Sequence, residues 1–122
     1  MIVRAAAILL ALGFAAPALA DDYPVSGRWG QVTGSTKGPV NCTGKRVIAF
    51  SGNQRTDSKG GVPAYRNKSV TGDGVSRWRV IDIFTTGQIR NGAMSYTLVQ
   101  TDADHLEMVQ QKGGTIKLQR CQ

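Results

Sequence analysis

Groups that usually carry catalysis or bind metals are scarce in this sequence of 122 residues. It contains one histidine, His105, and no serine within a G-x-S-x-G motif. The 8 acidic residues are dispersed, so no cluster supplies the six or more oxygens of a calcium site. The SKGG stretch at 58–61 lacks the spacing of a phosphate-binding loop. We therefore expect no enzymatic activity, no metal and no cofactor, with His105 exposed to solvent.

Long hydrophobic runs are also absent after the beginning of the chain. Residues 1–20 combine Arg4, an apolar stretch and an A-x-A ending at Ala20, a pattern typical of a cleaved secretory signal. No later segment is apolar for long enough to span a membrane. The alanine-rich signal is typical of bacteria. We therefore predict a signal peptide at 1–20, one domain at 21–122, and a secreted or periplasmic protein of a Gram-negative bacterium.

The hydrophobic period of a helix is missing after the signal, whereas two-residue alternation and β-branched or aromatic residues recur. Turn sequences at 71–74, 91–92, 101–104 and 112–114 connect the segments that show this pattern. We predict an all-β fold, an antiparallel up-and-down meander of about seven or eight strands closed into a small barrel, because closure removes the exposed edges. The predicted strands that follow the first one, near Trp29, are 45–51, 63–70, 75–84, 94–100, 105–110 and 115–121.

The only cysteines are Cys42 and Cys121. Export delivers them to an oxidising compartment, so we predict a disulfide between them. The bridge would close a loop of about 80 residues, which stabilises a domain on the order of 4 kcal/mol. Two free thiols that serve a metal or a reaction are the alternative.

Positive charge exceeds negative charge, with a net charge of +7. Such a surface favours anionic partners, among them anionic envelope components, although solubility alone is an alternative explanation. Export argues against nucleic acid as the partner.

Two segments, 33–41 and 51–63, show no strand pattern. The second has no apolar residue from 51 to 61 but carries Arg55, Asp57 and Lys59, so we expect a solvated loop.

Trp29 in the first predicted strand and Arg120 in the last are expected to meet if the barrel closes. Alternation places Arg120 on the inward face, where its guanidinium can cover the indole and donate to backbone carbonyls. Gly27-Arg28-Trp29 together with Arg120 resembles the signature of the calycins, which include lipocalins, fatty-acid-binding proteins, avidins and some bacterial metalloprotease inhibitors. The resemblance implies an antiparallel barrel of about eight strands, closed at one end by the tryptophan and the arginine. The motif of the middle section of lipocalins is missing.

Asp82 is the most informative charged residue. If Val80 faces the core, alternation buries Asp82 as well, and an unpaired buried carboxylate costs several kcal/mol. Asp82 then needs a partner such as Arg28, Arg120 or a tyrosine hydroxyl. Two alternatives are that it anchors a ligand in the lumen, or that the strand faces the other way and exposes it.

We expect a monomeric, non-catalytic binding protein that takes a small apolar or amphipathic molecule at the barrel mouth. A barrel of about eight strands leaves room for its own side chains or for one small ligand, and a filled interior is the favoured interpretation. An alternative is an inhibitor or a cell-envelope interaction protein, with Arg55, Asp57 and Lys59 as its surface-binding loop. The candidate ligand-binding residues are Trp29, Tyr65, Trp78, Asp82, Tyr96 and Arg120.

Overall fold

The computed structural model describes residues 22–122, which form an all-β domain without helices. The signal peptide predicted for 1–20 lies outside the described residues. The eight strands are β1 (Gly27–Gln31), β2 (Val47–Ser51), β3 (Gln54–Asp57), β4 (Tyr65–Gly72), β5 (Arg77–Phe84), β6 (Gly92–Asp102), β7 (His105–Gln110) and β8 (Thr115–Arg120).

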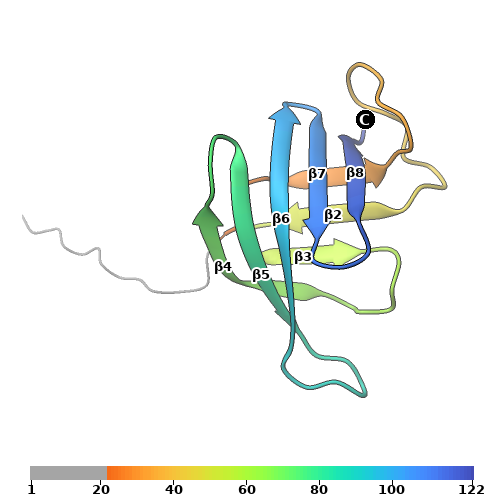
Figure 1. The fold of residues 1–122 in the computed structure, drawn as a ribbon. Helices are drawn as coiled ribbons and strands as arrows, with labels where there is room; N and C mark the ends of the chain where they lie inside the picture. The colour runs from red at the N-terminus through yellow and green to blue at the C-terminus, as the bar shows by residue number, and fades with distance from the viewer. Residues whose placement is uncertain (1–21) are drawn as a thin grey trace, which may run out of the picture.

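Each strand pairs antiparallel with the next along the chain, and β8 pairs with β1 to close the barrel. Figure 1 shows β5 to β8 running steeply across β1 to β3, as expected when a strongly twisted sheet rolls up on itself. The predicted meander and its closure into a barrel are therefore confirmed.

Strand β3 corrects the prediction that 51–63 is an irregular loop. Its side chains alternate between exposed Gln54 and Thr56 and inward-facing Arg55 and Asp57. Because both inward positions carry charges, the strand shows no alternation of apolar and polar residues. A search for hydrophobic periodicity therefore cannot detect it.

Strand β5 adopts the first of the two orientations that the sequence allowed. Val80 and Asp82 are fully buried, whereas Arg77 and Arg79 are exposed. Ile81 lies on the outer face with 36% of its surface exposed. The polar Asp82 therefore occupies a core position, and an aliphatic side chain occupies a surface position.

The core is a cluster of apolar side chains from most of the strands, and each contributes about 1.5–3 kcal/mol when fully buried. Tyr23 and Val25, which precede β1, belong to this cluster. The Tyr23 backbone N–H donates to the carbonyl of Gly52 at 2.9 Å, which ties the N-terminal segment to the end of β2. The other members are Trp29, Ile48, Phe50, Val80, Tyr96, Leu98, Leu106, Met108, Ile116 and Leu118.

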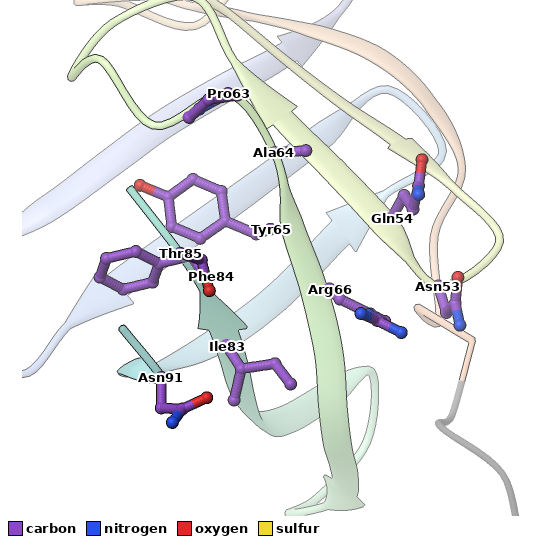
Figure 2. A pocket seen from close by; sticks show the side chains of 10 residues that line it. All are labelled: Asn53, Gln54, Pro63, Ala64, Tyr65, Arg66, Ile83, Phe84, Thr85 and Asn91. Atoms are coloured by element: carbon purple, nitrogen blue, oxygen red, sulfur yellow. The ribbon is translucent and has the colours of Figure 1, made fainter. Parts of the chain in front are cut away.

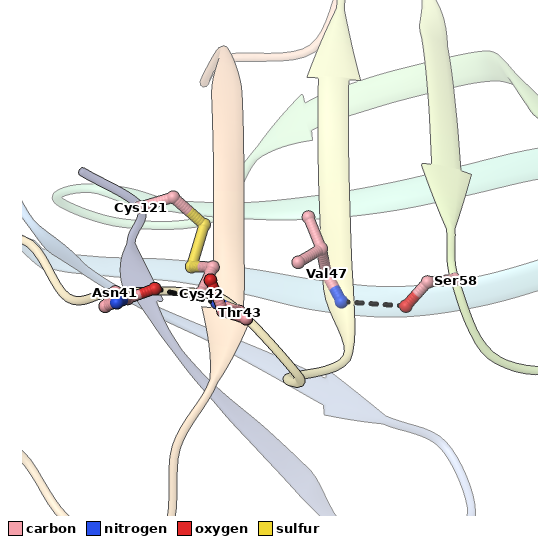
Figure 3. The surroundings of a disulfide bond; sticks show 6 residues. All are labelled: Asn41, Cys42, Thr43, Val47, Ser58 and Cys121. Carbon is pink, nitrogen blue, oxygen red and sulfur yellow. Dashed lines mark hydrogen bonds between the residues drawn. A yellow bond between two sulfur atoms is a disulfide. The ribbon is translucent and has the colours of Figure 1, made fainter.

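The predicted disulfide is present and joins the segment before β2 to the residue after β8. Cys42 and Cys121 are bonded, with their Cα atoms 5.5 Å apart, and lie beside β1 (Figure 3). Gly30 of β1 faces this bridge, and a Cβ atom there would lie 2.6 Å from the Cys42 Sγ. Next to the bridge, the Asn41 Oδ1 accepts the Thr43 N–H at 2.9 Å. A glycine is required at position 30 because the disulfide passes so close to the strand.

Candidate functional site

A buried hydrogen-bond network surrounds the carboxylate of Asp82 inside the barrel. Its Oδ2 accepts from the Arg55 Nε at 2.8 Å and from the Tyr96 hydroxyl at 2.8 Å. Its Oδ1 accepts from the Tyr23 hydroxyl at 2.9 Å and from the Asn67 Nδ2 at 3.3 Å. Four donors thus satisfy this carboxylate, which makes its complete burial tolerable.

The guanidinium of Arg55 is enclosed by soft and aromatic groups. Its Cζ lies 3.8 Å from the centre of the Tyr65 ring and 5.3 Å from that of Tyr96. Its Nη2 lies 3.6 Å from the sulfur of Met94. Arg55 is only 1% exposed, so these ring faces replace water around the charge.

Burial and charge keep this network in one protonation state. Burial raises the pKa of Tyr23, and the neighbouring Asp82 carboxylate raises it further. Burial likewise raises the pKa of the Tyr96 phenol well above its usual value. Burial lowers the pKa of Arg55, but its contacts with Tyr96 and Asp82 outweigh this, and the net shift is upward. Both phenols therefore remain donors and Arg55 remains charged at neutral pH.

The residues of the predicted surface-binding loop do not form a common surface. Arg55 is buried in the network just described. Asp57 accepts two hydrogen bonds from Arg46, at 2.9 and 2.6 Å. Burial raises the pKa of Asp57, but the hydrogen bonds from Arg46 and the Lys59 N–H, together with the charges of Arg46 and Arg55, outweigh it and hold the pKa below its usual value. Lys59 alone of the three predicted residues stays on the surface.

Trp29 and Arg120 meet as predicted, on paired positions of β1 and β8. The Arg120 Cζ lies 4.4 Å from the centre of the fully buried Trp29 ring. The Nε and Nη2 atoms of Arg120 donate to the carbonyl of Ala103 at 3.2 and 3.0 Å, and the Asp104 carboxylate lies 3.5 Å away. The Trp29 Nε1 donates to the Ser26 carbonyl at 3.1 Å. The pair closes this end of the barrel.

The predicted ligand-binding residues thus separate into two groups. Three of them surround Arg55 in the interior, and two close the end of the barrel near the chain termini. Trp78 is partly buried and packs against the core. The interior group is Tyr65, Asp82 and Tyr96, and the end group is Trp29 and Arg120.

A tyrosine hydroxyl was among the predicted partners of Asp82, and this is confirmed, since both Tyr23 and Tyr96 donate to the carboxylate. The cation was not identified from the sequence. The salt bridge expected for this carboxylate is present, but its cation is Arg55 instead of Arg28 or Arg120. The need of a buried Asp82 for a partner indicated that a cation could lie nearby, but no local pattern identified Arg55 as that cation, because residues 54–57 are all polar. The role of Tyr23 carried no comparable signal, because it lies outside any strand.

A hollow of about 580 Å³ opens where β3, β4 and β5 meet the loop at 85–91 (Figure 2). We call it the β3–β5 hollow. Tyr65 begins β4 and Phe84 ends β5, so the hollow lies at the rim of the barrel. Its volume falls within the range of about 300–1,000 Å³ that is usual for small-molecule sites.

The lining of the β3–β5 hollow combines apolar and polar groups. Figure 2 shows the rings of Tyr65 and Phe84 on one side and the amides of Asn53 and Gln54 on the other. The two rings pack edge to face, with centres 5.3 Å apart. Arg66 lies on the same side of β4 as the two amides, is exposed, and pairs with no carboxylate among residues 22–122.

Within residues 22–122, no group of three acidic, histidine or cysteine side chains is arranged to hold a metal. The same part of the chain contains no helix that is long and apolar enough to cross a membrane. No protein-family model, no curated protein and no solved structure matches this chain.

Proposed function

We propose that the chain is a non-catalytic, secreted or periplasmic binding protein whose ligand is a small amphipathic molecule with an acidic group. The ligand binds in the β3–β5 hollow, at the rim of the barrel. The observation that carries this proposal is the guanidinium of Arg66, which has no carboxylate partner among residues 22–122 and lies on the strand position paired with Ile83, at a hollow of about 580 Å³ that the Phe84 ring also lines. A cation next to an apolar wall selects a ligand that has both an anionic and an apolar part.

The rigidity of the scaffold supports this function. Tyr65 lines the hollow and also stacks on Arg55, which is fixed by its salt bridge to Asp82. The wall of the hollow is therefore held in place by the interior network. A preformed site loses less conformational entropy when it binds a ligand.

Two further observations support export and a calycin-like relationship. The disulfide between Cys42 and Cys121 agrees with folding in an oxidising compartment, where the predicted signal at 1–20 would deliver the chain. The stacking of Arg120 on Trp29 between β8 and β1 supports the similarity to calycins. Among the calycins, lipocalins, fatty-acid-binding proteins and avidins hold small molecules, which is consistent with the proposed role.

The test uses 1-anilinonaphthalene-8-sulfonate, an apolar anion whose fluorescence rises when it leaves water. We expect saturable binding that Arg66→Gln weakens about tenfold, because a charge-assisted hydrogen bond contributes roughly 1.5–3 kcal/mol. Lys68→Gln is the matched control, since Lys68 is an exposed cation two positions along the same strand and does not line the hollow. Equal affinity of the two variants would refute the assignment of the site to the β3–β5 hollow.

Native mass spectrometry of the protein purified from its own cell compartment provides an independent measurement. A co-purifying acidic, partly apolar molecule that is lost in Arg66→Gln and retained in Lys68→Gln would identify the ligand. A bound molecule that is neutral and fully polar would contradict the proposed ligand class.

A further inference from the structure

The large hydrophobic side chains exposed within residues 22–122 lie on β5 or in the connections at its two ends. They are Val75, Ile81 and Ile89, with 95%, 36% and 47% of their surfaces exposed. Ile81 lies on the outer face of β5, while the other two lie in the connections that precede and follow this strand. An exposed aliphatic group at the surface of a small domain is unfavourable in water, and several along one strand and its two connections indicate an interaction surface.

The same part of the barrel carries cations without acidic partners. Lys68 and Arg79 are exposed on β4 and β5, and Arg90 directly follows Ile89. None of the three pairs with a carboxylate among residues 22–122. We call Lys68, Arg79, Arg90 and the aliphatic residues Val75, Ile81 and Ile89 the β5 face.

Ile81 and Arg79 lie two positions apart on the outer face of β5, and the strand register identifies their neighbours. Ile81 pairs with Ser69 of β4 and Ser95 of β6, and Arg79 pairs with Thr71 and Thr97 of the same two strands. The neighbouring positions are therefore neutral and small. The nearest exposed carboxylate along the chain, that of Asp73, lies 3.6 Å from Arg77 and is balanced by it, whereas Asp82 is buried in the interior.

We propose that the β5 face docks on the surface of an anionic phospholipid bilayer. Lys68, Arg79 and Arg90 would contact headgroup phosphates, and Ile81 and Ile89 would enter the boundary between headgroups and acyl chains. Basic residues near a membrane surface attract anionic lipids, and apolar side chains add affinity by leaving water. A soluble anionic polymer would satisfy the cations but would leave the aliphatic groups in water. The proposal is independent of the β3–β5 hollow.

The opposite side of the barrel lacks this combination. Lys37, Lys45 and Lys117 are exposed there, on or near β8, but none of the large exposed hydrophobics of residues 22–122 lies in that region. The segment at 33–41 also covers part of β8, because the Gln119 side chain donates to the carbonyls of Thr36 and Gly38. These three lysines supply a control with the same change of charge.

The test measures co-sedimentation with phosphatidylcholine vesicles that contain or lack phosphatidylglycerol. All proteins are purified in the form that accumulates after export, and intact mass confirms a common N-terminus. We expect binding only to the anionic vesicles, with affinity that falls as salt rises. The variant K68Q/R79Q/R90Q should bind roughly a hundredfold more weakly, at about fivefold per cation. The control K37Q/K45Q/K117Q should retain most of its binding.

A second pair of variants tests the aliphatic contacts. I81S/I89S keeps every charge and should lower vesicle binding about tenfold, because two partly exposed side chains no longer gain from leaving water. All of these substitutions are at exposed positions, and thermal unfolding checks that each variant is folded. Equal loss in the two triple variants, or full binding by I81S/I89S, would overturn the proposal.

Dextran sulfate, a soluble polyanion, tests the alternative that the partner is an anionic polymer and not a membrane. If it captures the wild type and I81S/I89S equally while vesicles capture neither, the partner is an anionic polymer and the membrane proposal fails. Arg66 is unchanged in every variant, and K68Q/R79Q and I81S also leave the loop at 85–91 unchanged, so probe binding by these two variants in the β3–β5 hollow reports separately on the proposed function.

Discussion

Arg55 and Asp82 form a salt bridge of 2.8 Å between two strands, β3 and β5, that are separated by β4. Both side chains are completely or almost completely buried. Removal of one partner leaves an uncompensated charge in the barrel, which costs about 3–5 kcal/mol. We therefore expect Asp82→Asn and Arg55→Met each to lower the free energy of unfolding by this amount in urea denaturation.

The double variant R55M/D82N distinguishes this pairing from general core damage. It should lose much less stability than the sum of the two single variants, because neither charge is left alone. Arg79→Met, at an exposed position of β5, serves as the control and should change stability by less than about 0.5 kcal/mol. Additive losses in the double variant would show that an unpaired buried charge is not the main cause of the destabilisation.

This salt bridge also marks the limit of what the sequence could predict. The strands with alternating apolar residues, their short turns and the closure of the barrel follow from local patterns. Strand β3 does not, because its inward positions are occupied by Arg55 and Asp57. Their burial depends on partners far away in the chain, Asp82 and Arg46, and no local pattern records such a contact.

The candidate site was predictable to a similar degree. Trp29 and Arg120 could be paired because barrel closure brings the first and last strands together. The β3–β5 hollow could not be predicted, because it is lined partly by the loop at 85–91. The path of this loop depends on the packing of Phe84 and Ile89 around Gly92. A side chain at Gly92 would meet the Phe84 ring at 2.6 Å, a contact that only coordinates reveal.

The second prediction concerns the stacking of Arg120 on Trp29. Arg120→Met should lower stability by about 1–2 kcal/mol, because it removes the cation over the indole and the hydrogen bonds to the Ala103 carbonyl. Arg120→Lys keeps the charge but loses the planar fork, so it should recover little of this loss. The fluorescence of Trp29 in a Trp78→Phe background should change in both variants. If Arg120→Lys kept the full stability of the wild type, the positive charge alone would account for the contribution of Arg120.

The third prediction concerns the disulfide and the glycine beside it. C42A/C121A should lower the free energy of unfolding on the order of 4 kcal/mol, since the bridge closes a loop with a sequence separation of 79. Gly30→Ala should destabilise the oxidised protein, because its Cβ would lie 2.6 Å from the Cys42 Sγ. In the C42A/C121A background that sulfur is absent, so the same substitution should cost less. An equal cost in both backgrounds would show that backbone conformation, not the sulfur, requires the glycine.

The last prediction concerns pH. His105 is not freely solvated as expected: its Nδ1 lies 2.7 Å from the Asp102 carboxylate and its Nε2 lies 2.7 Å from the Thr36 carbonyl. Both ring nitrogens face acceptors, which favours the imidazolium. The hydrogen bond to Asp102 raises the pKa of His105, and the same bond lowers the pKa of Asp102.

The direction of the pH effect follows from these two shifts. The contribution of His105 to stability is complete below its unfolded pKa of about 6.5 and is lost as the pH rises through the higher folded value. The contribution of Asp102 is complete above its unfolded pKa of about 3.9 and is lost as the pH falls through its lower folded value. The pair should therefore stabilise the contact with the segment at 33–41 most strongly between about pH 4 and pH 6.5.

His105 is the only histidine, so its imidazole resonances can be assigned without ambiguity in an NMR titration. We expect its pKa to lie above about 6.5 in the wild type and to fall in Asp102→Asn, because the acceptor of the Nδ1 proton loses its charge. Glu107→Gln changes an acidic residue on the same strand that makes no salt bridge among residues 22–122, and it should leave the pKa nearly unchanged. The protection factors of the Thr36 and Lys37 amides, which correct for base-catalysed exchange, should fall above the His105 pKa in the wild type. Equal protection factors on both sides of that pKa would show that the histidine does not hold the segment in place.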